Sequence, residues 1–379
     1  MYVLNNLPFV GIDALGVLMI TASTPPRFLI IQTAFIGDVI LATALLEQLH
    51  QARPDARIDL LVRRGNEGLL ANHPFLNEVL IWEKKTNKYG SLWQLLQTIR
   101  TRRYNAVLNL QRYGTTGLLT AFSRAEIRIG FNKNPFSRFF THRVEHRFAP
   151  GVHEVDRNAQ MLHALTLTPG PSPRTGEGSN TPGSSPLSRS GRGAGGEGTR
   201  PKLYPSPADY DAVKSYQAQP YVCIAPTSVW FTKQYPAERW AELIGALPDT
   251  TMVYLLGAPA DVAACEHIRE QSQQANRVVV LAGQLSLLQS AALQQGAAMN
   301  YVNDSAPLHL CSAMNAPTTA VFCSTVPEFG FGPLADVSRV VQVREPLECK
   351  PCGLHGRKTC PLGHFECGWG ISVDELAHL

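Results

Sequence analysis

Short apolar runs alternate with longer amphipathic segments from Phe28 onward, and this alternation predicts the fold. In the first half of the chain, the apolar runs predict strands at 28–32, 58–62, 79–81, 106–110 and 127–130. The amphipathic segments predict helices at 38–51, 67–72, 91–103 and 153–165. Continuously apolar strands separated by helices are typical of a parallel sheet that is covered by helices on both faces.

The same alternation starts again after residue 220. It predicts strands at 221–225, 252–256, 278–281, 299–302 and 318–322, and helices at 237–247, 261–272, 286–295 and 307–314. We therefore expect an α/β fold with two Rossmann-like doubly wound domains that face each other across a cleft. Ligands of such sheets bind beyond the carboxyl ends of the strands, so the candidate chemistry should lie in the loops that follow strands.

A segment of different composition separates the two halves. Residues 168–204 are dominated by Gly, Pro, Ser, Thr and Arg, and contain almost no large apolar side chain. Such a segment cannot bury enough surface to offset its ordering entropy, which predicts a disordered linker or insert. This divides the chain into domains at 27–167 and 205–379, with an N-terminal extension at 1–26 of uncertain status.

Charge and composition exclude several classes of protein. The 34 basic and 30 acidic residues leave a formal charge of only +4, so we expect no broad basic surface for nucleic acid. Eight cysteines in 379 residues do not make a disulfide-stapled scaffold. The apolar run at 9–22 is interrupted by Asp13 and is shorter than the ~20 residues that cross a bilayer.

The first candidate motif, at 32–41, joins a strand end to a helix start through a turn with one glycine, Gly37. The G-x-G-x-x-G pattern is absent, which argues against a nicotinamide or flavin site. Asp38 follows this turn and has two interpretations. It is either a first-turn acid that interacts with the helix dipole, or a general base at the edge of the cleft.

The second candidate motif also follows a predicted strand and combines hydroxyl groups with one positive charge. Its residues are Thr227, Ser228, Thr232 and Lys233. This combination suits an anion such as a diphosphate, with the lysine acting as a point charge. The alternative is a packed loop with a solvated Lys233.

In the third candidate motif, a predicted strand runs directly into a helix at Asp304 and Ser305. Free N–H groups at such a helix start bind anions. The alternative is ordinary capping, with His309 as a buried core residue. The turn from Gly257 to Asp261 is similar, and Asp261 either contacts a ribose or caps its helix.

Four cysteines cluster near the C-terminus with the spacing Cys349-x2-Cys352-x7-Cys360-x6-Cys367. They could hold a tetrahedral zinc ion. However, the second pair lacks the C-x2-C spacing of common zinc ribbons, so reduced or disulfide-forming thiols are the alternatives. No catalytic metal follows from this pattern.

A basic stretch in the first domain is interleaved with phenylalanines. Its charged residues include Arg124, Arg128, Lys133, Arg138, Arg143 and Arg147. An anionic, partly lipidic partner would explain both the charges and the aromatic residues, whereas a solvated loop is the alternative.

In chain order, these motifs resemble glycosyltransferase family 9, the ADP-heptose:lipopolysaccharide heptosyltransferases. The resemblance covers 27–376 apart from the insert, and rests on FLIIQTAFIGDVILATALLEQL, YNAVLNLQ, RIGF, HEVDRNAQML, SVWFTKQYP, YLLGAP, NDSAPLHL and the C-terminal cysteines. It implies the two-domain GT-B architecture and transfer of a heptose, with inversion, from ADP-heptose to the lipopolysaccharide inner core. It also implies no cofactor, a lipid A-core acceptor, and a cytoplasmic location with peripheral contact to the inner face of the membrane.

The resemblance also implies roles for individual residues. Asp38 matches the catalytic base, and Lys233 matches the lysine that neutralises the diphosphate leaving group. Asp304 and the following amides match the donor-binding turn, in which the family usually has glycine at the position of Ala306. Together with the motifs above, the candidate donor-binding residues are Thr227, Ser228, Thr232, Lys233, Gly257, Asp261, Asp304, Ser305, Ala306 and His309. The basic stretch supplies the candidate acceptor-binding residues.

Other functions use the same two-domain plan. A related glycosyltransferase would take a UDP or GDP sugar, and a hydrolysing or epimerising enzyme would consume a nucleotide sugar without an acceptor. A non-catalytic relative would only bind a sugar nucleotide or lipid. The presence of Asp38, Lys233 and Asp304 together argues against a degenerate site.

Overall fold

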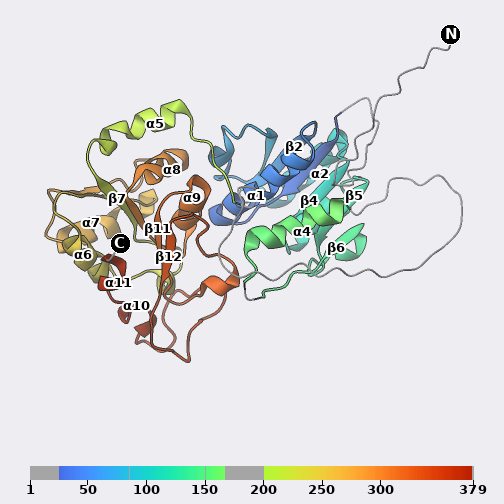
Figure 1. The fold of residues 1–379 in the computed structure, drawn as a ribbon. Coiled ribbons are helices and arrows are strands. Elements are labelled where there is room, and N and C mark those ends of the chain that lie inside the picture. Colours follow the sequence, from blue (N-terminus) through green and yellow to red (C-terminus); the bar gives the residue numbers. More distant parts are fainter. Residues whose placement is uncertain (1–24, 85, 150, 167–199, 378–379) are drawn as a thin grey trace, which may run out of the picture.

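The computed structural model describes residues 25–84, 86–149, 151–166 and 200–377 (Figure 1). Within these residues, the first sheet has six parallel strands in the order β3-β2-β1-β4-β5-β6. The strands are β1 (Arg27–Ile31), β2 (Arg57–Arg63), β3 (Leu76–Trp82), β4 (Ala106–Asn109), β5 (Ile127–Phe131) and β6 (His142–Val144). The helices of this domain are α1 (Ile36–Ala52), η1 (Glu67–Leu70), α2 (Lys88–Arg102), α3 (Gly114–Ala121), η2 (Ser137–Phe139) and α4 (Glu154–Thr166).

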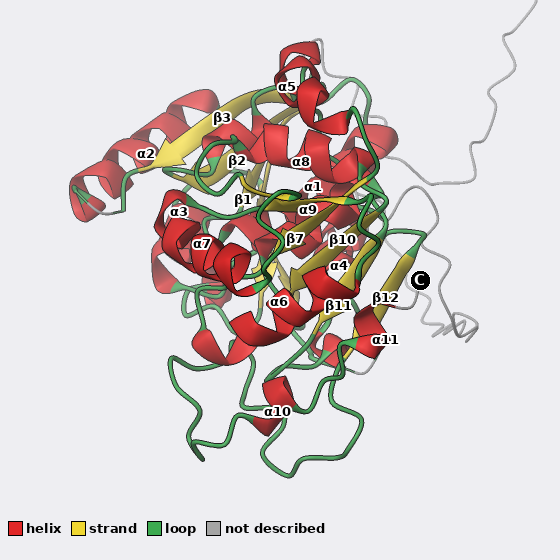
Figure 2. Ribbon diagram, turned by 90° about the vertical axis from the view of Figure 1, so that its left-hand side faces the viewer, coloured by secondary structure: helices red, strands yellow, loops and turns green. Residues whose placement is uncertain are grey.

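The second sheet also has six parallel strands, in the order β12-β11-β10-β7-β8-β9. They are β7 (Tyr221–Ala225), β8 (Met252–Leu255), β9 (Val278–Val280), β10 (Met299–Asn303), β11 (Thr318–Val321) and β12 (Ser338–Val341). Its helices are α5 (Pro207–Val213), η3 (Lys214–Gln217), η4 (Phe231–Lys233), α6 (Ala237–Ala246), η5 (Pro259–Asp261), α7 (Val262–Gln271), α8 (Leu287–Gly296), α9 (Ala306–Met314), η6 (Pro327–Phe329), α10 (Glu366–Trp369) and α11 (Asp374–Ala377). Figure 2 shows helices on both sides of the strands.

Both sheets have the same strand order, and each reverses its winding between its first and fourth strands. In the first sheet this switch point lies between β1 and β4, and in the second it lies between β7 and β10. Connections on the two sides of a switch point leave in opposite directions, which opens a crevice at the carboxyl ends of these strands. The predicted α/β fold with two doubly wound domains is therefore confirmed.

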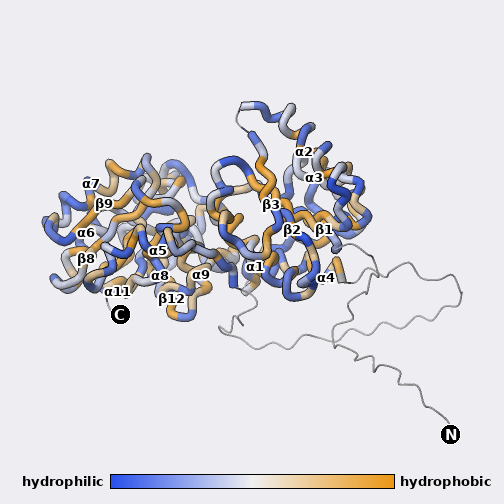
Figure 3. Tube along the Cα trace, turned by 90° about the horizontal axis from the view of Figure 1, so that it is seen from above, coloured by the Kyte–Doolittle hydropathy of each residue, from blue (hydrophilic) through white to orange (hydrophobic). Residues whose placement is uncertain are grey.

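The helix that follows β1 is buried almost all round. Every residue of α1 from Val39 to Glu47 is buried, as expected for a helix that is apolar on all its faces. One side packs on the first sheet, another on α4, and a third on α9 of the second domain. Figures 1 and 3 both show α1 and α9 side by side between the domains. The position of α1 is thus fixed from both domains.

Most predicted elements are present, with ends that differ by a few residues. The predicted helix at 67–72 is instead the short 3-10 helix η1, and the first turn of α1 begins earlier than expected, at Ile36. The structure adds α3, α5, β6 and β12, which the hydrophobic pattern did not predict. These elements are short, and β6 contains two basic side chains in only three residues, so its pattern is weak.

The predicted disordered linker at 168–204 lies outside the described residues up to residue 199, and so does the extension at 1–24. For residues 200–204 the prediction is wrong. The backbone N–H of Lys202 donates to Thr43 Oγ1 at 3.0 Å, Leu203 is buried, and the Tyr204 hydroxyl donates to Glu47 at 2.8 Å. These residues therefore pack along α1, because polar groups of that helix offer partners that composition does not reveal.

Candidate functional site

Asp38 lies in the first turn of α1, directly beyond the carboxyl end of β1. Burial raises the pKa of its carboxyl group, because the charged form loses contact with water. The backbone N–H groups of Phe35 and Asp38 and the charges of Arg63 and Lys233 oppose this rise. Asp38 is therefore a first-turn acid that is also suited to accepting a proton, and its two interpretations do not exclude each other.

Lys233 and Asp304 form an ion pair across the switch point of the second sheet. Lys233 ends η4 in the loop after β7, and Asp304 follows β10. The Lys233 Nζ atom lies 2.7 Å from Asp304 Oδ2, and both side chains are largely buried. Asp304 Oδ2 also accepts a hydrogen bond of 2.6 Å from the Thr325 hydroxyl. These contacts hold the ammonium group at the start of α9.

Asn303 fixes the two loops of this pair relative to each other. Its Oδ1 atom accepts from the Tyr235 N–H at 2.9 Å, and its Nδ2 atom donates to the Pro226 carbonyl at 2.7 Å. Asn303 is the last residue of β10 and is fully buried. Both ends of the loop that contains Lys233 are thus tied to the strand that leads to Asp304.

The first turn of α9 offers polar groups that no protein atom satisfies. Ser305 is the N-cap, yet its side chain makes no capping bond, and Ala306 and Pro307 follow it. Among the described residues, Ser305 Oγ and His309 Nδ1 are buried atoms without a hydrogen-bond partner. Burial, together with the charges of His153 and Lys233, lowers the pKa of His309 to about 3, so its ring is neutral. Buried unsatisfied groups beside a helix N-terminus are consistent with a site for an anionic ligand.

The other candidate donor-binding residues have different surroundings. Thr227 and Ser228 are half-buried at the start of the loop after β7. The hydroxyl of Thr232 is buried and accepts from the Arg357 N–H at 2.8 Å and from Ser324 Oγ at 2.9 Å. The Thr232 hydroxyl is therefore engaged by groups of the protein itself.

Gly257 and Asp261 lie after β8, one strand away from β7. Asp261 Oδ2 accepts from the Ala258 N–H at 2.7 Å, so this carboxylate stabilises the local turn. Asp261 lies at the carboxyl edge of the sheet, as expected. Of its two interpretations, helix capping and contact with a ribose, its hydrogen bond supports capping.

The charge of Lys233, in the second domain, lowers the pKa of Asp38 in the first, so the two groups interact electrostatically across the domains. Sequence reasoning missed three charged residues around them: Arg63, Arg112 and Glu154. Arg63 ends β2 and Arg112 follows β4, so both lie at the carboxyl edge where ligands bind. The charge of Asp38 contributes to the raised pKa of Glu154, for which burial is the main cause. Their positions after strands were the signal that could have identified the two arginines.

The residues of the basic stretch have different surroundings. Arg124 precedes β5 and Arg128 lies near its start, whereas Lys133 follows its end. Arg128 donates to the carbonyls of Ala125 at 2.5 Å and Phe139 at 3.1 Å. Of the remaining residues, Arg138 lies over the ring of Phe139, Arg147 pairs with Glu145, and Arg143 is exposed.

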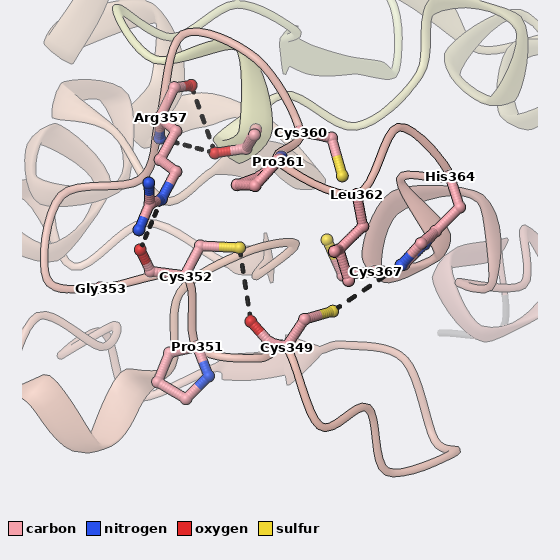
Figure 4. A pocket seen from close by; sticks show the side chains of 11 residues that line it. Cys349, Pro351, Cys352, Gly353, Arg357, Cys360, Pro361, Leu362, His364 and Cys367 are labelled. Atoms are coloured by element: carbon pink, nitrogen blue, oxygen red, sulfur yellow. Dashed lines mark hydrogen bonds between the residues drawn. The ribbon is translucent and has the colours of Figure 1, made fainter.

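Near the C-terminus, Cys349, Cys352, Cys360 and Cys367 line a cavity of about 410 Å³, together with His364 and Arg357 (Figure 4). All eight cysteines of the chain are free thiols. In the described part of the chain, no group of three or more His, Cys, Asp or Glu side chains is arranged to hold a metal ion. The same part contains no helix that is both long and apolar enough to traverse a bilayer.

Two doubly wound Rossmann-type sheets, with Asp38 beyond the first strand of one and the Lys233–Asp304 pair at the switch point of the other, have the GT-B architecture. Comparison with known proteins agrees. The family model for glycosyltransferase family 9 (heptosyltransferase) matches residues 92–364, and the chain belongs to this family.

Individual relatives support this assignment. The chain is 26% identical over 307 residues to lipopolysaccharide heptosyltransferase 3 of Escherichia coli, covering 77% of this chain and 82% of that protein. A family 9 glycosyltransferase from Veillonella parvula DSM 2008 has a TM-score of 0.75 at 19% identity, with 94% and 96% of the two chains covered. The ADP-heptose LPS heptosyltransferase II of E. coli has a TM-score of 0.66 at 21% identity, with 86% and 95% covered. At these identities the two solved structures support the fold alone.

Proposed function

We propose that this glycosyltransferase moves a heptose from ADP-heptose to the inner core of lipopolysaccharide, with inversion at the anomeric carbon. One observation supports this most strongly. Asp38 and Lys233 come from opposite domains, each at the carboxyl edge of its sheet, and are close enough to interact electrostatically. A base on one side and a cation on the other are the groups that a single displacement requires.

The chemistry follows from this arrangement. Asp38 accepts the proton of the acceptor hydroxyl while the hydroxyl oxygen forms its bond to the anomeric carbon. The bond from that carbon to the diphosphate oxygen breaks, and ADP leaves on the opposite face, which inverts the configuration. Lys233 and the positive end of the α9 dipole stabilise the charge on the diphosphate, so the proposed mechanism requires no metal ion.

Several features support a nucleoside diphosphate donor at α9. Ser305 Oγ and His309 Nδ1 are unsatisfied there, and Lys233 is held at the same helix start. The related E. coli heptosyltransferase II is described as an ADP-heptose enzyme, which favours ADP among the nucleotides. The methyl group of Ala306 sits in the first turn of α9, where it would narrow the space for the diphosphate.

We also propose that the protein is cytoplasmic and contacts the inner face of the membrane, where a lipid-linked acceptor would lie. The rings of Phe122, Phe136 and Phe139 touch one another, and the Arg138 guanidinium lies 4.7 Å from the centre of the Phe139 ring. Phe122 and Phe139 are exposed. Exposed aromatic side chains next to arginines suit an anionic lipid surface.

Vesicle binding tests the membrane contact. The triple variant Arg138→Gln, Arg143→Gln and Arg147→Gln should lose the salt-sensitive part of binding to anionic vesicles. Unchanged binding of this variant would contradict the assignment of this surface.

Nucleotide release tests the proposed reaction. The enzyme is incubated with ADP-, UDP- and GDP-sugars, with and without heptose-deficient lipopolysaccharide core. We expect release of ADP from ADP-heptose only when the acceptor is present. Acceptor-dependent release from a UDP or GDP sugar instead would contradict the proposed donor, and release without any acceptor would indicate hydrolysis.

A further inference from the structure

The C-terminal segment 349–367, called here the cysteine loop, is attached directly to the loop that contains Lys233. The N–H of Thr232 donates to the Arg357 carbonyl at 3.1 Å, and the Arg357 N–H donates back to Thr232 Oγ1 at 2.8 Å. The Cys352 N–H donates to the Ser324 carbonyl at 2.9 Å. Since Thr232 immediately precedes Lys233, these bonds fix residues 355–357 beside the candidate donor site.

Gly356 shows how close this approach is. Its backbone has a φ of +74°, and a Cβ atom built on it would lie 2.8 Å from Lys233 Cγ and 3.2 Å from Thr232 Oγ1. The residue before it, His355, is exposed. The loop backbone therefore packs against the stem of Lys233, with an accessible imidazole at the adjacent position.

Charges of both domains act on His355. Lys233 and Asp304 of the second domain and Arg112 of the first are all near enough to act on it electrostatically. Asp304 is the single negative charge among these groups and is already paired with Lys233. Arg357, on the same loop, donates its Nε–H to the Cys352 carbonyl. The space next to His355 thus has an excess of positive charge.

We propose that His355 is a donor-binding residue that contacts the diphosphate of the nucleotide sugar, and that the cysteine loop positions it for this contact. The proposal rests on the proposed function, since it assumes a nucleoside diphosphate at the start of α9. A diphosphate carries the negative charge that Lys233 and Arg112 together attract, and an imidazole N–H donates a hydrogen bond to a phosphate oxygen in either protonation state.

A proton should be taken up when the diphosphate binds. Partial loss of hydration and the charges of Lys233 and Arg112 lower the pKa of His355 from its ordinary value, while Asp304 opposes this change. A diphosphate beside the ring would raise the pKa again, because it favours the imidazolium form. Binding of ADP near neutral pH should therefore be coupled to protonation of His355.

The experiment measures binding of ADP and of adenosine by calorimetry, in two buffers of different ionisation enthalpy. For His355→Ala we expect the Kd for ADP to rise about tenfold, an effect of the size of one hydrogen bond to a charged group. The Kd for adenosine, which has no phosphate, should stay unchanged. The buffer-dependent proton uptake should be smaller in the variant, because the contribution of His355 is lost while that of the ADP phosphate remains. Lys358→Ala removes an exposed charge of the same loop and should leave both affinities as in the wild type.

Other outcomes overturn the proposal. Equal weakening of ADP and adenosine in His355→Ala would show that the residue only maintains the structure. An unchanged ADP affinity in the folded variant would exclude contact with the diphosphate. A wild type that binds ADP but releases none from ADP-heptose would contradict the proposed function alone, because the binding comparison for His355 needs no turnover.

Discussion

Gly37 of the first domain lies directly against the imidazole ring of His309 of the second domain. A Cβ atom built on Gly37 would be only 2.7 Å from Cδ2 of His309. His309 is buried on α9, and Gly37 immediately precedes Asp38 on α1. The contact therefore fixes the candidate base relative to the helix start that we propose binds the donor, and a glycine is required because no side chain fits between them.

Substitution of Gly37 by alanine tests this contact. Gly37→Ala should lower the free energy of unfolding by about 1–3 kcal/mol, the usual cost of overpacking, and should reduce turnover because Asp38 moves. Combining it with His309→Ala removes the ring, so the double variant should be more stable than the sum of the two single effects predicts. Urea unfolding of all three variants measures this coupling.

Gly68→Ala is the matched control, since a Cβ atom there would have no atom within 4 Å. This control should unfold like the wild type. Simple additivity of Gly37→Ala and His309→Ala would show that the two residues do not constrain each other.

The pH dependence of the reaction should reflect the environment of Asp38. The base must be ionised, so kcat/KM should fall as the pH is lowered through the pKa of Asp38, which burial raises above 3.8. Because the charge of Arg63 lowers this pKa, Arg63→Gln should move the acid limb of the profile to higher pH. Arg53→Gln, whose partner is the surface residue Asp55, should leave the limb in place. A limb that does not move in Arg63→Gln would argue against Asp38 as the titrating group.

Removal of the Lys233 charge should affect both binding and chemistry. Lys233→Ala leaves the largely buried Asp304 side chain without its cation but with its hydrogen bond from the Thr325 hydroxyl, and removes the charge that we propose stabilises the leaving diphosphate. We expect kcat/KM to fall by about 10²-fold or more and ADP binding to weaken. Steady-state kinetics and calorimetry measure the two effects. Lys214→Ala, in exposed η3, serves as the control, and wild-type kinetics in Lys233→Ala would refute its role.

Arg157 joins the two domains through hydrogen bonds. Its guanidinium donates to Glu154 at 2.8 Å and to the Val152 carbonyl at 2.9 Å, and across the domains to the Phe329 carbonyl at 2.7 Å. Since the side chain is fully buried, Arg157→Ala should cost about 3–5 kcal/mol of unfolding free energy, because Glu154 loses its partner.

Arg269→Ala, which breaks a surface pair with Glu266, is the comparison for that measurement. Its cost should be at most about 1 kcal/mol. Equal losses of stability in the two variants would show that the buried hydrogen bonds of Arg157 contribute no more than a surface ion pair.

The sequence predicts the parts of the molecule that depend on local pattern. Apolar strands separated by helices identified both sheets, and the rule for ligands at strand ends placed Asp38, Lys233 and Asp304 at the carboxyl edges. The contacts between distant segments were not predictable in this way. Nothing in the spacing shows that Lys233 pairs with Asp304, or that Thr232 binds the cysteine loop, because those contacts depend on tertiary packing.

Elements of weak local pattern were also missed. The strand β6 has three residues, and its register beside β5 is set by pairing rather than by hydrophobicity. Residues 200–204 have the composition of a disordered segment but are placed by contacts with Thr43 and Glu47. Arg63 and Arg112 could have been found, since both lie at strand ends.

The proposed mechanism requires that Asp38 of one domain and the donor site of the other act together. The most direct test is to measure acceptor-dependent ADP release by the variant Asp38→Asn. Asparagine keeps the size of the side chain but cannot accept the proton, so turnover should fall by about 10²–10⁴-fold. The Kd for ADP should change little, because we propose that the second domain binds the donor. ADP release at the wild-type rate by Asp38→Asn would contradict the role of Asp38 as the base.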